Sequence, residues 1–141
     1  MCIRDRLILY LGINDLFVDP HLSVDLMAEE LERTIEGVRD VDPSANLLVL
    51  SPLPVNVGRE YHDDFHEQVE KSFDLASAYR EITEREGCHF LDPSRVISAS
   101  KRDGVHIEAE EHIKLGLHLC VVVRDLFPHV DSPSRGKRKK R

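Results

Sequence analysis

The chain has 141 residues, the length of one ordinary domain with a single hydrophobic core. Its formal net charge of −7 is unevenly distributed, because residues 131–141 hold six of the 19 basic side chains and only one of the 26 acidic ones. The rest of the chain therefore carries 13 basic and 25 acidic side chains, and this acidic body excludes nucleic acid and anionic membrane as partners of the folded part. Residues 129–141 are predicted to form a disordered basic tail, with a contact to an acidic surface as the alternative.

No apolar stretch approaches the length of a membrane-spanning helix, and the N-terminus lacks the apolar core of a signal peptide. The three cysteines, Cys2, Cys88 and Cys120, do not have the spacing of metal ligands, and their odd number argues against a disulfide framework. We therefore expect a cytoplasmic protein that uses no metal ion and no other cofactor.

The first six residues, MCIRDR, look like translated adapter sequence of the kind that begins some assembled metagenomic reading frames. We interpret residues 1–6 as a non-native leader and leave them out of the fold prediction, with a native start as the alternative. The folded domain is then predicted to extend over residues 7–128.

The first half of the chain predicts a strand, a helix and a second strand. Residues 7–11, LILYL, form a continuous apolar run typical of a strand covered on both faces. Ser23 is the predicted N-cap of a helix that continues to about Val41 and is stopped by Pro43. Residues 46–50, NLLVL, predict a second buried strand.

The second half repeats this alternation. A long helix is predicted from about Asp63 to Glu86, a third strand at residues 88–92, and a last helix over residues 108–127. Strands alternating with helices of this length predict a parallel sheet with right-handed crossovers, so the predicted fold class is α/β. The apolar positions predict the inner faces of the two helices, which are Phe65, Val69, Phe73, Ala76, Tyr79 and Ile82 in the first and Ile113, Leu117, Cys120 and Val123 in the second.

The chemistry is expected beyond the carboxyl ends of the strands, where open parallel sheets bind their ligands. Asn14 follows the first strand in the sequence GIND, and the DGVH loop at residues 103–106 precedes the last helix and so returns to the same edge. Asp103 can orient the imidazole of His106 as a base, while Asn14 offers an NH₂ donor suited to a developing oxyanion. Gly12 lets the backbone bend without a side chain that would block the site. These groups together indicate acyl transfer, although a nucleophile is missing.

At these residues the chain resembles a known family. The sequence LGIND looks like the third conserved block of the SGNH, or GDSL-type, serine hydrolases, and DGVHIEAEEHIKLG looks like their fifth. The intervening LLVLSPLPV and GCHFLDPS are similar to the arylesterase-like bacterial branch, and the resemblance covers about residues 7–127.

The resemblance implies a partial flavodoxin-like three-layer sandwich whose first strands are missing, and hydrolysis of a small-molecule ester through a Ser-His-Asp triad. On that basis His106 would be the general base, Asp103 its partner and Asn14 the donor to the oxyanion, with Gly12 the glycine of the same block. The family carries its nucleophilic serine in a Gly-Asp-Ser motif after the first strand and a further oxyanion glycine after the second, and neither block exists in this chain.

A fragment without the nucleophile is expected to be inactive alone, and its first strand is expected to form a bare, association-prone sheet edge. One smaller departure from the family is Glu108, which stands where a helix-capping Ser or Thr is usual and puts the start of the last helix in doubt.

Simpler interpretations stay open at these positions. Asn14 could belong to an ordinary turn, and the segment from Asp103 to His106 could be a helix entry with a surface histidine. Three serines, Ser51, Ser98 and Ser100, lie near strand ends or the loop, but none has the Gly-Asp-Ser context of a nucleophile.

Three further histidines carry simpler interpretations. His62 and His66 are spaced as zinc ligands on one helix face, but no third ligand accompanies them, so an exposed helix start is preferred. His112 matches a histidine common in the family's last block and is interpreted as a packing or hydrogen-bonding residue. The alternative function is a non-catalytic α/β binding module or a degenerate homologue; among enzymes it is a carbohydrate or lysophospholipid esterase. A homo-oligomer is compatible with either.

Overall fold

The structure is a computed structural model that describes residues 6–19, 21–57 and 65–127. Residues 1–5 of the predicted leader at residues 1–6, the basic tail (residues 129–141) and His62 lie outside the described residues, whereas Arg6 is the first residue of the first strand. The elements follow in the order β1 (Arg6–Tyr10), α1 (Asp15–Val18), α2 (Val24–Val41), β2 (Asn46–Leu50), α3 (His66–Arg85), β3 (His89–Leu91), the 3₁₀ helix η2 (Pro93–Arg95) and α4 (Ala109–Leu126).

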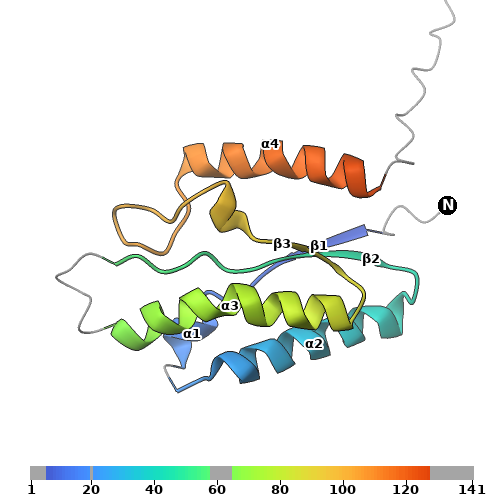
Figure 1. Ribbon diagram of the computed structural model, residues 1–141, viewed down its shortest axis with the longest axis horizontal. Coiled ribbons are helices and arrows are strands. Elements are labelled where there is room, and N and C mark those ends of the chain that lie inside the picture. Colours follow the sequence, from blue (N-terminus) through green and yellow to red (C-terminus); the bar gives the residue numbers. More distant parts are fainter. Residues whose placement is uncertain (1–5, 20, 58–64, 128–141) are drawn as a thin grey trace, which may run out of the picture.

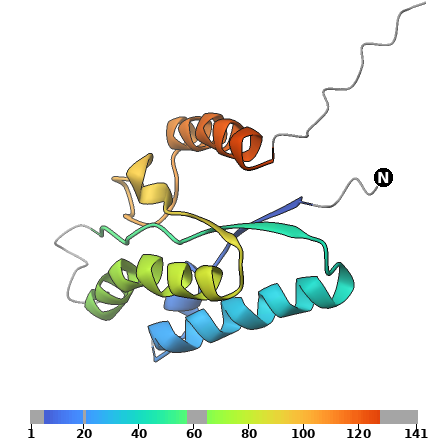
Figure 2. The ribbon, with the colours of Figure 1, turned by 45° about the vertical axis from the view of Figure 1, so that its right-hand side comes forward.

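The three strands form one parallel sheet in the order β1-β2-β3. Helices α1, α2 and α3 lie on one face of the sheet and α4 lies on the other, so the molecule has three layers (Figures 1 and 2). The predicted α/β class and the parallel sheet are confirmed. None of the described helices is long and apolar enough to span a membrane.

Strand β2 is the centre of the core. Its residues from Leu47 to Leu50 are at most 2% exposed, and Leu48 pairs with Ile8 of β1 on one side and His89 of β3 on the other. Because side chains alternate along a strand, Leu47 and Val49 pack into the cluster under α2 and α3, whereas Leu48 and Leu50 pack into the cluster under α4. Four consecutive apolar residues are thus needed at β2, as its sequence indicated.

Helix α2 forms as the sequence predicts. Ser23 is its N-cap and its hydroxyl oxygen accepts a hydrogen bond from the Leu26 N–H at 3.1 Å. The helix ends at Val41, and Leu31 and Ile35 are at most 1% exposed against the sheet. Replacing such a cap by alanine typically costs about 1 kcal/mol, so this single serine defines where the helix starts.

The predicted inner face of α3 is partly wrong. Tyr79 and Ile82 are buried as expected, but Phe73 is 62% exposed and Leu75 takes the inward position. The buried face also includes Ser72, whose hydroxyl accepts from the Val55 N–H at 2.8 Å and donates to the Val69 carbonyl. A pattern read from apolar residues alone misplaces such a face, because a polar side chain can be buried once its hydrogen bonds are satisfied.

The inner face predicted for α4 is also mostly wrong. Ile113 and Leu117 are 63% and 67% exposed and Cys120 is exposed, while Leu115 is buried beneath the helix. Val123 does pack toward the sheet, together with other partly buried side chains of the same helix. Helix α4 is apolar around most of its circumference, so its periodicity could not decide which stripe would meet the sheet.

Strand β1 is an edge strand of the described sheet, and the prediction that it is covered on both faces is not met. Leu7, Ile8 and Tyr10 are 39%, 44% and 39% exposed, although the register with β2 is regular along all five residues. An apolar edge with unpaired backbone groups is a template for pairing with another chain.

Substituting Ile8 with lysine should therefore reduce self-association of the chain, because a charge on the edge opposes strand pairing. Sedimentation velocity at matched concentrations would show a higher monomer fraction for Ile8→Lys than for the unchanged protein. Val41→Lys is the matched control, since Val41 is 87% exposed at the end of α2, away from this edge. Equal self-association of the two variants would contradict the role given to the edge.

Candidate active site

The chain turns sharply where it leaves β1. Gly12 has a φ of +110°, and a Cβ at this position would lie 2.3 Å from the Tyr79 hydroxyl oxygen. No other residue type fits this turn without displacing Tyr79, whose pKa is raised to about 12 by burial and, to a smaller extent, by the charge of Asp15. Gly12 is itself buried, so its observed part in the site is to let the backbone turn toward Asn14.

Asn14 begins the short helix α1. Its carbonyl accepts hydrogen bonds from the N–H groups of Phe17 and Val18, both at 3.0 Å, which fixes the backbone of the turn. Its side chain is exposed and makes no capping bond to α1. The amide is therefore held on a rigid turn but remains available to a ligand.

The second part of the site is the loop before α4. One carboxylate oxygen of Asp103, Oδ1, accepts from the backbone N–H groups of Val105 and His106, both at 2.9 Å. The other, Oδ2, lies 2.9 Å from the imidazole Nδ1 of His106. These contacts hold the pKa of Asp103 down at about 2, chiefly through the two backbone donors and then through the bond to the ring.

An ionised carboxylate can only accept hydrogen bonds, so Nδ1 of a neutral His106 must carry the proton. The other ring nitrogen, Nε2, is then left with its lone pair, which is the form that acts as a base. The His106 side chain is 81% exposed and Asp103 is 45% exposed, so the pair is accessible to a reactant.

This loop is attached to the segment that leaves β2. The Asn56 N–H donates to the Gly104 carbonyl at 2.8 Å. Gly104 has a φ of +72°, and a Cβ there would lie 2.2 Å from backbone atoms of Asn56. The close approach of the two backbones thus requires a glycine between Asp103 and His106.

The structure brings Asn14 and His106 together in the lining of one pocket of about 310 Å³. Asp103 contacts His106 but does not itself line the pocket, and neither does Gly12. The full lining is Tyr10, Leu11, Ile13, Asn14, Pro52, Leu53, Val105, His106, Ile107 and His112.

Most of these walls were not identified from the sequence. Tyr10 and Leu11 belong to the apolar run at residues 7–11, which predicted only a strand. Pro52 and Leu53 follow β2, a strand end at which ligands are expected to bind but which was given no site residue. Their position directly after parallel strands was the available sign of a pocket wall. His112, interpreted as a packing residue, also lines the pocket.

No serine among the described residues lines this pocket. Ser51 is completely buried, and its hydroxyl has no hydrogen-bond partner. Ser100 is 4% exposed and donates its hydroxyl proton to Glu108 at 2.5 Å. Neither is placed to act as a nucleophile toward a substrate beside His106.

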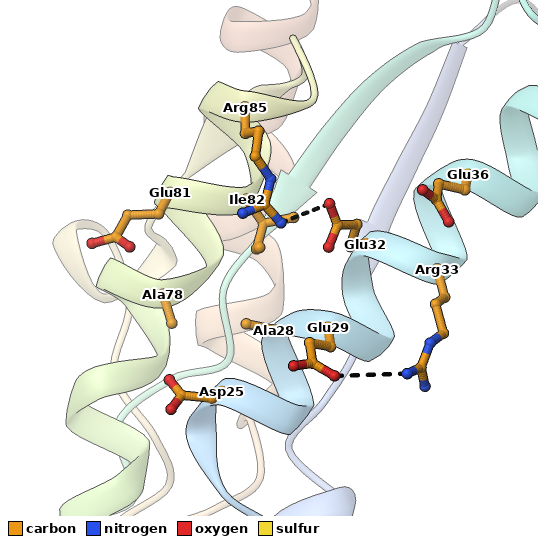
Figure 3. A pocket seen from close by; sticks show the side chains of 10 residues that line it. All are labelled: Asp25, Ala28, Glu29, Glu32, Arg33, Glu36, Ala78, Glu81, Ile82 and Arg85. Atoms are coloured by element: carbon orange, nitrogen blue, oxygen red, sulfur yellow. Dashed lines mark ion pairs between the residues drawn. The ribbon is translucent and has the colours of Figure 1, made fainter.

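A larger pocket, of about 600 Å³, lies on the outer side of α2 and α3 (Figure 3). Arg85 of α3 reaches across it to Glu32 of α2 at 2.6 Å, and Arg33 pairs with Glu29 at 3.6 Å. The Arg85–Glu32 pair thus joins the two helices, and the described lining of this pocket contains no serine, threonine, cysteine or histidine. Within the described ranges, no group of three His, Cys, Asp or Glu side chains is arranged to hold a metal ion.

Comparison with known proteins relates this chain to acylhydrolases and esterases. The family model for the GDSL-like lipase/acylhydrolase family matches residues 4–119. A carbohydrate acetylesterase family member from Sinorhizobium meliloti is similar in structure with a TM-score of 0.76 and 28% sequence identity, over 88% of this chain and 62% of that one. The native aryl esterase of M. smegmatis is similar with a TM-score of 0.74 and 26% identity, over 86% of this chain and 61% of that one.

The chain thus spans about three fifths of the length of these two structural neighbours. Among the curated proteins, none matches the sequence.

Replacing Gly104 with alanine should destabilise the protein by about 3 kcal/mol or more, because the added Cβ meets backbone and a left-handed conformation is strained. Gly87→Ala is the matched control, since Gly87 also has a positive φ, of +62°, but has nothing within 4 Å of the added atom. The control should cost only about 1–2 kcal/mol in urea unfolding. Equal losses would show that the contact with Asn56 does not constrain the loop.

The carboxyl group of Asp103 should titrate near pH 2 in the folded protein, below its ordinary value of 3.8. Because the folded pKa is lowered, the ionised group stabilises the fold above its unfolded pKa, and this contribution is lost as the pH falls from about 4 to about 2. The ¹³C shift of the carboxyl carbon would report the titration, and the stability difference between Asp103→Asn and the unchanged protein should shrink over the same range. Titration near pH 4 would contradict the hydrogen bonds to Val105 and His106.

Proposed function

The chain belongs to the GDSL-like lipase/acylhydrolase family, and we propose that its pocket is the acid–base and oxyanion-binding part of an ester-hydrolysing site. The observation that carries this proposal is the arrangement of His106 and Asn14 in one pocket, with Asp103 hydrogen-bonded to the far side of the imidazole. A base oriented by a carboxylate, beside an amide donor, is the arrangement that acyl transfer requires.

In the proposed reaction, Nε2 of His106 accepts the proton of a serine hydroxyl while the serine oxygen attacks the ester carbonyl. The NH₂ group of Asn14 donates to the oxyanion of the tetrahedral intermediate, and Asp103 stabilises the imidazolium that forms. His106 then returns its proton to the departing alcohol, leaving an acyl-enzyme. Water attacks this ester with His106 again as base, which releases the acid and regenerates the serine.

The serine in this scheme comes from polypeptide outside the present chain, so we expect the chain alone to be inactive. Two features support a site that is completed beside β1. The exposed edge strand ends at Tyr10, and Tyr10 with Leu11 also forms part of the pocket wall. A strand added next to β1 in parallel would therefore end beside His106, since the carboxyl ends of parallel strands lie at one edge.

The substrate is proposed to be a small-molecule ester with a short acyl group. The pocket of about 310 Å³ is at the small end of the usual range for ligand sites, and Leu11, Ile13, Leu53 and Ile107 make its walls largely apolar. The name of one structural neighbour, a carbohydrate acetylesterase family member, fits an acetyl group. We also propose a reducing, cytoplasmic setting, which was expected from the cysteine usage of the sequence.

A chimera tests the proposal. The part of the Sinorhizobium meliloti neighbour that precedes its equivalent of β1 would be fused before Arg6, and hydrolysis of p-nitrophenyl acetate would be measured for the chimera and for the unextended chain. We expect turnover and fluorophosphonate labelling of the chimera only. Asn14→Ala in the chimera should lower kcat by about 10²–10³-fold, because one oxyanion donor is lost.

His106→Ala should abolish turnover in the chimera, while His118→Ala, which removes an imidazole of α4 outside the pocket lining, should leave it unchanged. Equal activity of the unextended chain would overturn the proposal that the nucleophile lies elsewhere. A folded chimera that neither turns over ester nor reacts with fluorophosphonate would favour a binding module or a degenerate homologue.

A further inference from the structure

Ser100 makes several hydrogen bonds within the loop that carries Asp103 and His106. Its N–H donates to the His106 carbonyl at 2.7 Å, and its carbonyl accepts from the Gly104 N–H at 2.8 Å. Its hydroxyl accepts from the Arg102 N–H at 3.0 Å. The residue is 4% exposed, so all three groups are withdrawn from water and rely on these partners.

The proton of the Ser100 hydroxyl is donated to the Glu108 carboxylate at 2.5 Å. Glu108 is the N-cap residue of α4, yet its side chain makes no capping bond to the helix. A side chain in this position ordinarily accepts from the first turn of its own helix. Here it reaches back to the loop instead.

A second carboxylate from the first turns of α4 makes a similar contact. Glu111 accepts from the Ser98 N–H at 3.0 Å and pairs with Lys114. The loop is thus connected at two points to the helix that follows it. The sequence predicts neither contact, because the spacing of Ser98 and Ser100 from Glu108 and Glu111 has no recognisable pattern.

We propose that Ser100 and Glu108 are positioning residues that hold the His106 imidazole against Asp103. The inference rests on the proposed function, in which Nε2 of His106 is the base. His106 is 81% exposed and therefore has few packing contacts of its own to fix its ring. The hydrogen bond to Asp103 orients the ring only while the loop backbone holds the two side chains at this spacing. Ser100 binds that backbone at the His106 carbonyl, and Glu108 binds Ser100 from α4.

A purely structural role would make a different prediction. If the Ser100–Glu108 contact only stabilised the fold, its loss would lower the unfolding midpoint without changing the state of the ring. If the contact positions His106, its loss weakens the bond from Nδ1–H to Asp103 and allows the proton to move to Nε2. The tautomer ratio of one imidazole thus separates the two roles.

The experiment is a long-range ¹H–¹⁵N correlation of the chain labelled with ¹⁵N-histidine, recorded at about pH 8.5, where an ordinary imidazole is neutral. His106→Gln assigns the resonance among the eight histidines. The unchanged protein should show His106 mainly as the Nδ1–H tautomer. Glu108→Ala should lower the ratio of Nδ1–H to Nε2–H by about fivefold, the factor that one net hydrogen bond is worth.

Glu108→Gln keeps an acceptor oxygen for Ser100 and should restore the ratio to within the error of the unchanged protein. Glu110→Ala is the charge-matched control, since Glu110 lies in the same turn and makes no hydrogen bond to the loop in the described part of the chain. Ser100→Ala should reproduce Glu108→Ala, and far-ultraviolet circular dichroism would establish that each variant is folded.

An unchanged ratio in folded Glu108→Ala would overturn the proposal, and so would an equal change in Glu110→Ala. The measurement needs no substrate, so it is independent of esterase activity. If the tautomer ratio changes in Glu108→Ala but the chimera is inactive, the positioning role holds and the proposed function is wrong. If the chimera is active but the ratio does not change, the proposed function holds and the positioning role is wrong.

Discussion

A single backbone hydrogen bond, from the Asn56 N–H to the Gly104 carbonyl, joins the loop of His106 to the segment leaving β2. The other hydrogen bonds of the loop, among the described residues, are internal to it or run to α4. β2 is the most deeply buried strand, and close packing restrains the chain that follows it. A loop that is hydrogen-bonded to this segment is therefore restrained as well. The left-handed conformation of Gly104 is the condition for this contact, so one glycine determines whether residues far apart in sequence share a pocket.

The elements that the sequence predicted are those in which one local rule dominates. The four buried residues of β2 and the serine cap of α2 each follow from short-range chemistry, and both were found where expected. The meeting of Asn14 with His106 follows from topology instead. Parallel strands place their carboxyl ends together, so the residue after β1 and the loop before α4 could be assigned to one edge without any knowledge of distances.

The features that could not be predicted are those in which two faces of a helix are equally apolar, or in which a polar side chain is buried by a contact with a distant segment. Helix α4 offers several apolar stripes, and only contact with the sheet shows that Leu115, not Ile113, is buried. In α3 the inward position of Ser72 depends on the N–H of Val55, a residue in a different segment. Ser100 shows the same limit at the site, because its importance lies in backbone and hydroxyl contacts that leave no trace in residue type or spacing.

The end of the exposed edge strand also lines the pocket. Tyr10 and Leu11 are 39% and 37% exposed at the end of β1, and both are pocket walls. A polypeptide that covered β1 would bury these side chains, with Leu7 and Ile8, at a gain on the order of 25 cal/mol per Å² of apolar surface. Under the proposed function, the same segment would also exclude water beside His106 and so strengthen the hydrogen bond from the Asn14 amide to an oxyanion. Under the proposed function, one added segment would therefore complete both the sheet and the site, and it would do so along the exposed apolar strand β1.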